Sequence, residues 1–288
     1  MKPHDRLRLA WLFALTLGYR GAFAGKAPPR AGAATTSRFV VYYGTADVPE
    51  LYDHDLAVLD SDVSPSILRK FGAGTTLLGY LSLGEAHQGR RYADELDRQG
   101  LLLARNANWP DARFIDVRDA RWTTMVVNDL VPAILARGFR GLFIDTLDSC
   151  AHLEQQDPTR FAGMTRASGL LVRAIRRAFP RMPIMVNRGY AVLGQIASEI
   201  DMVLGESVHT TYDAATRSYV RVAPADVRWQ LDRLQEVRRL APSVRLFSLD
   251  YWSPDDAAGL ASVYAEARAN SLVPYVATID LSRVIPRP

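Results

Sequence analysis

The sequence predicts a single α/β domain folded as a (β/α)8 barrel, the TIM-barrel architecture. Eight short apolar runs recur after residue 38, and they are continuous rather than alternating, as is typical of strands buried on both faces of a parallel sheet. Stretches with helical spacing of apolar residues lie between them. The length of 288 residues also fits, because about 264 residues remain after the first 24 and such a barrel takes about 250.

The predicted strands are 39–43, 56–60, 76–82, 141–145, 183–187, 202–206, 244–250 and 272–278. Helices are predicted at 64–71, 122–136, 160–179, 224–240 and 254–270. The first of these helices opens on Ser64 and Pro65, a favourable N-cap and first-turn pair. Residues 113–117, within an insertion at 104–121, predict a minor ninth strand. A doubly wound sheet is the main rival, but it would want a glycine-rich phosphate-binding turn after its first strand, and "YYGTAD" is not one.

The first 24 residues have the layout of a secretory signal peptide. A basic start is followed by the apolar run "LAWLFALTL" and by the small-x-small ending "AFA". Residues 25–37 are rich in small residues and proline, which predicts a flexible linker, so the barrel domain spans 38–288. We therefore expect export to the periplasm or the extracellular medium, with no stable membrane insertion after the signal is removed. An N-terminal anchor or a disordered tail is the alternative.

The charge distribution gives no sign of a nucleic-acid partner. The whole chain carries a net charge of +4, and most of it falls within the first 24 residues, where Lys2, Arg6, Arg8 and Arg20 face only Asp5. No run of lysine or arginine elsewhere indicates nucleic-acid binding. The chain has a single cysteine, so it forms no intrachain disulfide.

Acidic, amide and aromatic residues follow nearly every predicted strand. The active site of a (β/α)8 barrel lies at the C-terminal ends of its strands, so we expect these residues to gather at one end. A single aspartate there often caps the next helix, but Glu85 and Glu206 are less well explained because glutamate is a poor N-cap. Acids beside flat aromatic rings suit a carbohydrate site, where rings stack on sugar faces and acids bond hydroxyl groups. The predicted substrate-binding residues are Tyr43, Tyr80, Glu85, Asp148, Asn187, Arg188, Asp250, Tyr251, Trp252 and Asp280.

Asp145 and Glu206 are the predicted catalytic pair. Cleavage of a glycosidic bond needs one acid to protonate the leaving oxygen and one carboxylate to attack the anomeric carbon or activate water. The two residues end the fourth and sixth strands, and side chains from alternate strands share one layer of a barrel. Their gap could therefore suit the carboxyl separation of about 5 Å in a retaining enzyme. The structural alternative for Glu206 is a salt bridge to Arg188.

The sequence predicts neither a cofactor nor a metal. Acids at the strand ends, such as Asp145 and Asp148, could hold a hard cation. The histidines near the same strand ends, His87, His152 and His209, show no ligand spacing.

Seven motifs resemble, in order, those of glycoside hydrolase family 114, the endo-α-1,4-polygalactosaminidase family. They are "VVYYG", "LLGYLSLGE", "NWPDARFIDVRDARW", "GLFIDTLDS", "NRGY", "VLGES" and "YVATIDL". The resemblance implies a (β/α)8 barrel and endo-hydrolysis of α-1,4-linked galactosamine polymers with retention of configuration. It implies that Asp145 is the nucleophile and Glu206 the acid/base. It also implies that Glu85, Asp148 and the Asn187-Arg188 pair line the cleft.

Two other functions stay open at this point. One is a catalytically inactive barrel that binds polysaccharide, and the other is a glycosidase acting on neutral α-galactosides. The presence of both predicted catalytic carboxylates argues against the first, and a substrate panel would separate the second. The acids predicted at the strand ends would concentrate a cationic amino-sugar polymer and disfavour an anionic one. The acetylation preference and the oligomeric state are left undetermined by the sequence.

Overall fold

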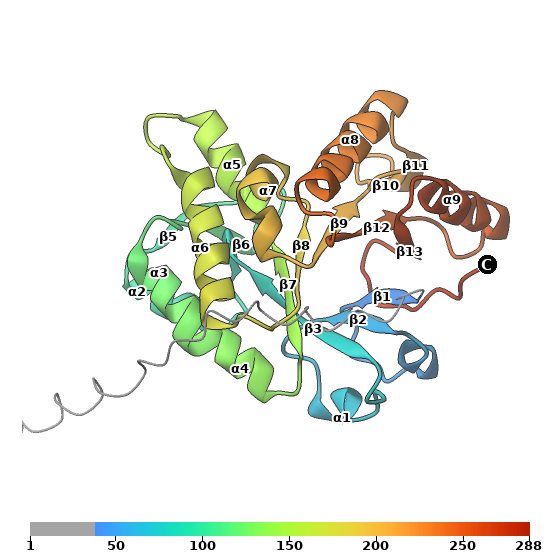
Figure 1. Ribbon diagram of the computed structural model, residues 1–288, viewed down its shortest axis with the longest axis horizontal. Helices are drawn as coiled ribbons and strands as arrows, with labels where there is room; N and C mark the ends of the chain where they lie inside the picture. Colours follow the sequence, from blue (N-terminus) through green and yellow to red (C-terminus); the bar gives the residue numbers. More distant parts are fainter. Residues whose placement is uncertain (1–37) are drawn as a thin grey trace, which may run out of the picture. The chain divides into compact units, whose positions relative to one another are not determined.

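Eight parallel strands form the centre of the computed structural model, which describes residues 38–288 (Figure 1). The predicted signal peptide and linker, residues 1–24 and 25–37, lie outside the described residues. The order in the sheet is β1-β2-β3-β7-β8-β9-β12-β13, so each of these strands pairs with the next one along the chain. Their bounds are β1 Phe39–Tyr42, β2 Leu56–Leu59, β3 Thr76–Ser82, β7 Gly141–Asp145, β8 Ile184–Asn187, β9 Met202–Glu206, β12 Arg245–Tyr251 and β13 Val273–Ala277.

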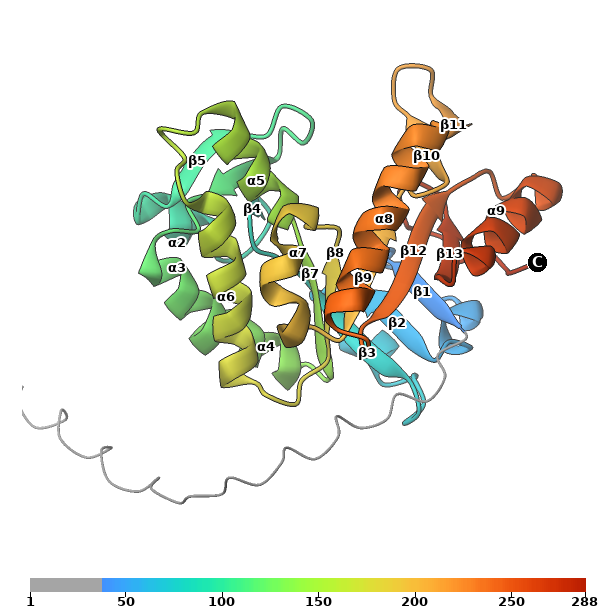
Figure 2. The same ribbon diagram turned by 45° about the horizontal axis from the view of Figure 1, so that its top comes forward.

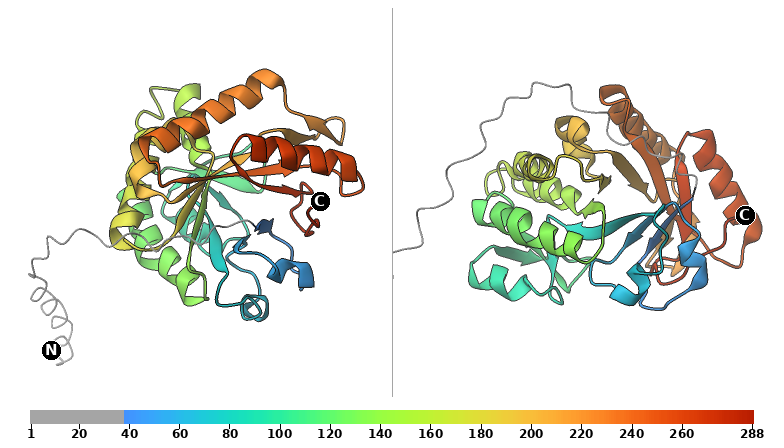
Figure 3. Two further views of the ribbon diagram at one scale, coloured as in Figure 1. Left: turned by 45° about the vertical axis from the view of Figure 1, so that its right-hand side comes forward. Right: turned by 60° about the horizontal axis from the view of Figure 1, so that its bottom comes forward.

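The sheet curls into a nearly closed (β/α)8 barrel with helices on its outside (Figure 3). Side chains close the gap between the first and last strands. The ring of Phe39 in β1 packs edge-on against Tyr275 in β13 at 5.9 Å and against Phe247 in β12 at 5.1 Å. A backbone hydrogen bond also joins the segments that follow β1 and β13, from the amide of Tyr43 to the carbonyl of Leu281 at 2.8 Å. The predicted fold class is therefore confirmed.

All eight predicted strands are confirmed to within one residue at each end. The physical reason is their burial. The four residues of β1, for example, are fully buried, and so are Ala57, Val58 and Leu59 of β2. Such continuous apolar runs are stable only between the barrel interior and the surrounding helices.

The predicted helices are present, with shifted ends. They correspond to α1 Pro65–Leu68, to the run formed by α3 Ala120–Met125, η2 Val126–Leu130 and α4 Val131–Ala136, and to α6 Met164–Ala178, α8 Pro224–Leu240 and α9 Ala257–Ala269. The η2 segment is a π-helical turn that ends just before Pro132, a residue with no N–H to donate. Elements not predicted from the sequence are α2 Ala93–Arg98, α5 Leu147–Gln156, α7 Tyr190–Ile196 and the 3-10 turns η1 Pro49–Tyr52 and η3 Ala197–Glu199.

Two small antiparallel sheets extend the barrel. The first joins β4 Glu85–His87, β6 Ala112–Ile115 and β5 Leu102–Arg105, in that order, and it contains the predicted minor strand. The second is a hairpin of β10 Thr210–Asp213 and β11 Ser218–Arg221. The first sheet begins shortly after β3 and the hairpin shortly after β9, so both lie at the C-terminal end of the barrel. Figure 2 shows them on opposite sides of that end.

Candidate active site

Asn187 joins the two predicted catalytic carboxylates. It ends β8, which lies between β7 and β9, the strands that end in Asp145 and Glu206. Its side-chain Nδ2 donates to Asp145 Oδ1 at 3.0 Å and to Glu206 Oε2 at 2.6 Å. Because both oxygens are bonded to one nitrogen, they lie at most about 5.6 Å apart, close to the separation of about 5–5.5 Å between the two carboxyl groups of retaining glycosidases.

Two tyrosines bind the outer oxygens of the same pair. The hydroxyl of Tyr80, on β3, donates to Asp145 Oδ2 at 2.9 Å. The hydroxyl of Tyr251, at the end of β12, donates to Glu206 Oε1 at 2.6 Å. Both oxygens of each carboxylate are therefore held in place, which is what preorganised acid–base and nucleophilic chemistry requires.

The protein raises the pKa of Asp145 from its ordinary value of 3.8 to about 6. The main cause is burial, and the second is the negative charge of Glu206. Hydrogen bonds from the Thr146 amide, Tyr80 and Asn187 act in the opposite direction. Asp145 therefore keeps its proton up to about this pH.

The backbone turns sharply after each of the three central strands. Thr146, Arg188 and Ser207 follow Asp145, Asn187 and Glu206, and their φ angles are 65°, 48° and 53°. These values lie in the left-handed region, which is unfavourable for residues other than glycine. Backbone hydrogen bonds across the barrel end maintain two of the turns, from Arg188 to Leu204 and from Ser207 to Leu249, each 2.8 Å. Such strained residues cluster at functional sites.

Glu85 lies in the wall of the same cleft and is only 6% exposed. Its carboxylate accepts bonds from Asn106 Nδ2 at 3.0 and 3.1 Å and from the Ser149 hydroxyl. Gly84 brings it there, because a side chain at that position would collide with the carbonyl of Thr146 at 2.2 Å. The Gly84 amide instead donates to the Thr146 hydroxyl at 2.8 Å.

Ion pairs hold two further parts of the cleft. Arg188 Nε lies 3.3 Å from Asp148 Oδ2, so the arginine pairs with Asp148 rather than with Glu206 as the structural alternative supposed. Arg90 binds both carboxylate oxygens of Asp60, at 2.7 and 3.0 Å, and it also contacts Asp62 at 3.0 Å. The guanidinium of Arg90 lies 5.5 Å from the ring centre of Tyr80, so it steadies that ring as well.

The cleft has a volume of about 1010 Å³. Ten of the twelve predicted site residues line it, namely Tyr43, Tyr80, Glu85, Asp145, Asp148, Asn187, Arg188, Glu206, Tyr251 and Asp280.

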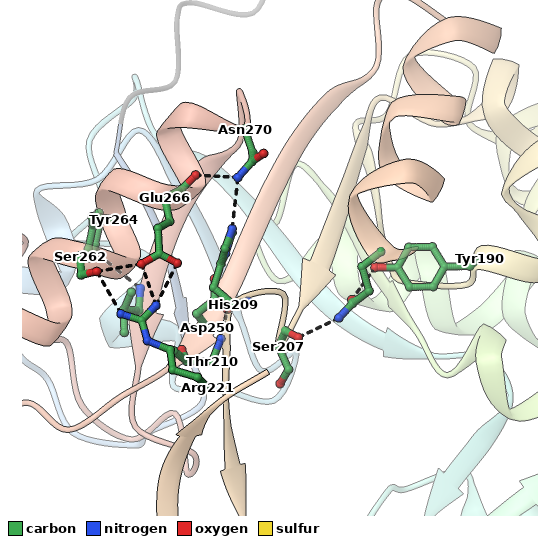
Figure 4. Close-up of polar contacts among 12 residues, drawn as sticks. Tyr190, Ser207, His209, Thr210, Arg221, Asp250, Ser262, Tyr264, Glu266 and Asn270 are labelled. Carbon is green, nitrogen blue, oxygen red and sulfur yellow. Dashed lines mark hydrogen bonds and ion pairs between the residues drawn. The ribbon is translucent and has the colours of Figure 1, made fainter. Parts of the chain in front are cut away.

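Asp250 does not belong to the cleft, which corrects the prediction that it binds substrate. It is 0% exposed, and it accepts bonds from the backbone amides of His209 at 2.6 Å and Thr210 at 2.9 Å (Figure 4). The ring Nδ1 of His209 lies 3.3 Å from its other oxygen. Neighbouring residues of a strand point to opposite faces, so Tyr251 faces the barrel interior and Asp250 faces away. Asp250 therefore anchors the start of the β10–β11 hairpin.

Trp252 is a second correction. Its ring nitrogen donates to Asp256 Oδ2 at 3.0 Å, and the guanidinium of Arg221 lies 5.5 Å from its ring centre. It packs against the apolar cluster beneath α9 and is not among the residues that line the cleft.

Several cleft residues were missed by the prediction. Asp60 and Asp62 look in the sequence like helix-capping residues, and Arg90, Asn106 and Trp109 lie in segments that read as loop or insertion. The "NW" pair within the insertion, Asn108 and Trp109, was the available signal for Trp109.

No helix within residues 38–288 is long and apolar enough to cross a membrane. In the same part of the chain, no group of three or more His, Cys, Asp or Glu residues is arranged to hold a metal ion.

A (β/α)8 barrel with paired carboxylates in an open cleft at the ends of its strands is the architecture of a glycoside hydrolase, and this protein is one. It belongs to glycoside-hydrolase family GH114, whose family model matches residues 21–288.

Similar proteins support this assignment. The glycoside hydrolase domain of PelA from Pseudomonas aeruginosa is 27% identical, with a TM-score of 0.74 over 86% of this chain and 97% of that domain. The structure of Aspergillus fumigatus Ega3 in complex with galactosamine covers 92% of this chain and 100% of Ega3 with a TM-score of 0.65, but at 14% identity it shows the fold alone. An uncharacterized protein from Thermotoga maritima is 25% identical over 73% of this chain and 67% of its own length.

Proposed function

We propose that the protein is an endo-acting, retaining hydrolase of polysaccharides containing α-1,4-linked galactosamine. The observation that supports the retaining mechanism best is the pair of carboxylates bridged by Asn187. Two carboxyl groups about 5 Å apart leave room for direct attack on the anomeric carbon, whereas an inverting enzyme needs about 6.5–9.5 Å to admit a water.

In the proposed mechanism Asp145 is the nucleophile and Glu206 is the acid/base. Glu206 protonates the glycosidic oxygen while Asp145 attacks the anomeric carbon, which gives a glycosyl–enzyme ester and releases one end of the polymer. Glu206 then removes a proton from water, which attacks the same carbon and frees Asp145. The Thr146 amide, Tyr80 and Asn187 all donate to Asp145, so three donors stabilise its ionised, attacking form.

The charge of the cleft supports a cationic substrate. Seven acids line the cleft, but its two arginines, Arg90 and Arg188, already pair with three of these acids. The other four acids are Glu85, Asp145, Glu206 and Asp280. None of them forms an ion pair with an arginine or lysine of the described residues. Galactosamine without an acetyl group carries an ammonium at neutral pH, so this cleft attracts it. The Ega3 structure, which contains galactosamine, adds to the proposal.

Export remains a prediction from the first 24 residues. It fits a polymer substrate, because a polysaccharide outside the cell can be reached only by an exported enzyme. Subcellular fractionation of the producing cell, followed by N-terminal sequencing of the protein found outside the cytoplasm, would test this prediction of export.

Azide rescue assigns the two carboxylates separately. Asp145→Ala and Glu206→Ala are incubated with a galactosamine oligosaccharide that has a good leaving group, with and without azide. We expect azide to replace the nucleophile in Asp145→Ala and give a glycosyl azide of inverted configuration. In Glu206→Ala azide should attack the glycosyl–enzyme ester and give the retained configuration. The reverse pattern would exchange the two roles.

A substrate panel tests the polymer itself. The wild-type protein is incubated with galactosamine polymer in deacetylated and N-acetylated forms and with a neutral α-galactan, and the products are identified by mass spectrometry. Internal cleavage of the deacetylated polymer is expected. Cleavage of the galactan alone would mean a neutral α-galactosidase, and binding without cleavage would mean an inactive barrel.

A further inference from the structure

Trp109 is the one described tryptophan whose ring has no partner. Its side chain is 66% exposed, and it lines the cleft from the loop between β5 and β6. The other three each have a contact: Trp122 donates to the Leu83 carbonyl, Trp229 packs edge-on against Tyr190, and Trp252 binds Asp256. An exposed indole on the wall of a cleft indicates a ligand-binding surface, because a solvated ring of this size contributes nothing to folding.

The loop beneath this ring is firmly held. Asn106 accepts the amide of Trp109 on its backbone carbonyl at 3.2 Å, and its side-chain oxygen accepts the amide of Asn108 at 2.9 Å. The carbonyl of Trp109 in turn accepts the amide of Ala112 at 2.8 Å. The neighbouring strand also binds the loop, since Gln88 donates to the Asp111 carbonyl at 2.8 Å. The indole is therefore presented by a rigid turn, which lowers the entropy lost when a ligand binds.

The anchor of this turn is the buried carboxylate of Glu85. Both of its oxygens accept from the amide of Asn106, the residue that organises the turn, and Ser149 on α5 holds it from behind. Glu85 thus connects the cleft wall to the loop that bears Trp109. Glu85 therefore not only lines the cleft but also positions the indole of Trp109.

We propose that Trp109 stacks on a sugar ring of the bound polysaccharide at a subsite away from the bond that is cleaved, and that Asn106 and Glu85 position it. The inference rests on the proposed function. The apolar face of a pyranose packs on the indole, and a protonated amine on the same sugar adds a cation–π attraction. We place this subsite away from the cleaved bond because Asn187, Tyr80 and Tyr251, which donate to the catalytic pair, lie on the barrel strands. Trp109 lies instead in the loop between β5 and β6, outside the barrel.

The test compares substrates of increasing length. Trp109→Ala, Trp109→Phe and Asn106→Ala are assayed in the full-length protein against a ladder of α-1,4-galactosamine oligosaccharides. Trp229→Ala is the matched control, because that indole is 52% exposed but lies outside the cleft lining. We expect Trp109→Ala to raise KM for long substrates roughly three- to tenfold while kcat/KM for the shortest cleaved substrate is unchanged. Trp109→Phe should lose less, and Asn106→Ala should show the same dependence on length.

Two results would overturn the inference. One is that Trp109→Ala matches Trp229→Ala at every length, and the other is that it loses activity equally at all lengths, which would indicate a purely structural role. The proposed function fails in a different way, when the wild-type protein cleaves none of the ladder. In that case affinity electrophoresis in gels containing deacetylated polymer, N-acetylated polymer or neutral galactan decides. Weaker retardation of Trp109→Ala than of Trp229→Ala upholds the stacking site for that polymer, and equal retardation rejects it.

Discussion

Asn187 resolves a physical conflict between two neighbouring acids. Like charges at this distance repel each other, and burial disfavours both ionised forms. One amide nitrogen that donates to Asp145 and to Glu206 offsets part of that cost and sets their spacing. The remaining cost is visible as the raised pKa of Asp145, about 6. The energy stored in this pair is typical of sites where function and stability compete.

Removing the Tyr80 hydroxyl should shift the pH dependence of the reaction. The hydrogen bond from Tyr80 lowers the pKa of Asp145, so Tyr80→Phe should raise that pKa further above about 6. If ionised Asp145 attacks the sugar, the acidic limb of the kcat/KM profile moves to higher pH by roughly one unit. Measured pH–rate profiles check this, with Tyr212→Phe on the hairpin as the control. An unmoved acidic limb in Tyr80→Phe would contradict the assignment.

Asp145→Asn should make the protein more stable at neutral pH. An acid with a raised pKa keeps its proton in the folded state after the unfolded chain has released it, so stability falls as pH rises from about 4 to about 6. A shift of about two units corresponds to about 3 kcal/mol as an upper limit. The amide never ionises, so the variant should gain up to that amount at pH 7.5 and little at pH 4.

Urea unfolding of both proteins at the two pH values provides the measurement. Asp232→Asn, which changes an exposed carboxylate on α8, should leave the pH dependence as it is in the wild type. A lower free energy of unfolding for Asp145→Asn at pH 7.5 would refute the prediction.

At the scale of elements, the barrel strands place the predicted catalytic groups, and the two added sheets shape the cleft between them. The hairpin β10–β11 is fixed at its base by Asp250, and its Tyr219 hydroxyl accepts the amide of Ile279, a residue of the cleft wall, at 3.4 Å. On the other side the β4–β6–β5 sheet is fixed through Glu85. Each of the two small sheets is thus held by one buried carboxylate. Glu85 accepts from Asn106 and Ser149, and Asp250 accepts from two backbone amides and also lies beside the His209 ring.

Asp250→Ala should lower stability and Asp280→Ala should raise KM, although both residues lie near the C-terminal ends of barrel strands. Removing the Asp250 carboxylate leaves buried amides without an acceptor, so we expect a loss of about 2–4 kcal/mol in the free energy of unfolding. Asp280 is exposed in the cleft, so its removal should cost little stability but raise KM for a cationic substrate. Denaturation curves and initial rates measured on both variants decide. Equal stability losses would reject the structural role given to Asp250.

The charge of the whole cleft should make activity depend on salt. On the proposed function, the acids of the cleft that form no ion pair should attract deacetylated polymer. Salt should screen that attraction, because the Debye length falls from about 30 Å at 0.01 M to about 3 Å at 1 M salt. We expect KM for the deacetylated polymer to rise several-fold over this range while kcat changes little. The N-acetylated polymer, which is neutral, serves as the control. The same salt response for both polymers would argue against electrostatic recognition.

The sequence by itself determined the barrel and predicted which of its ends carries the cleft. Continuous apolar runs of this short length indicate strands buried on two faces, and parallel strands bring their C-terminal ends together. The sequence therefore predicted that Asp145, Asn187 and Glu206 lie at one end of the barrel. The seven motifs also indicated the family, which is confirmed.

Only the tertiary structure decided which neighbours of those residues take part. Asp250 and Tyr251 are adjacent in sequence, yet the pleat directs Asp250 to the amides at the base of the hairpin and Tyr251 to Glu206. Trp109 and Glu85 are far apart along the chain, and antiparallel pairing of β4 with β6 brings them to one wall. The physical reason is that strand identity follows from local hydrophobicity, whereas the direction of a side chain and the partners of a loop depend on contacts between distant segments.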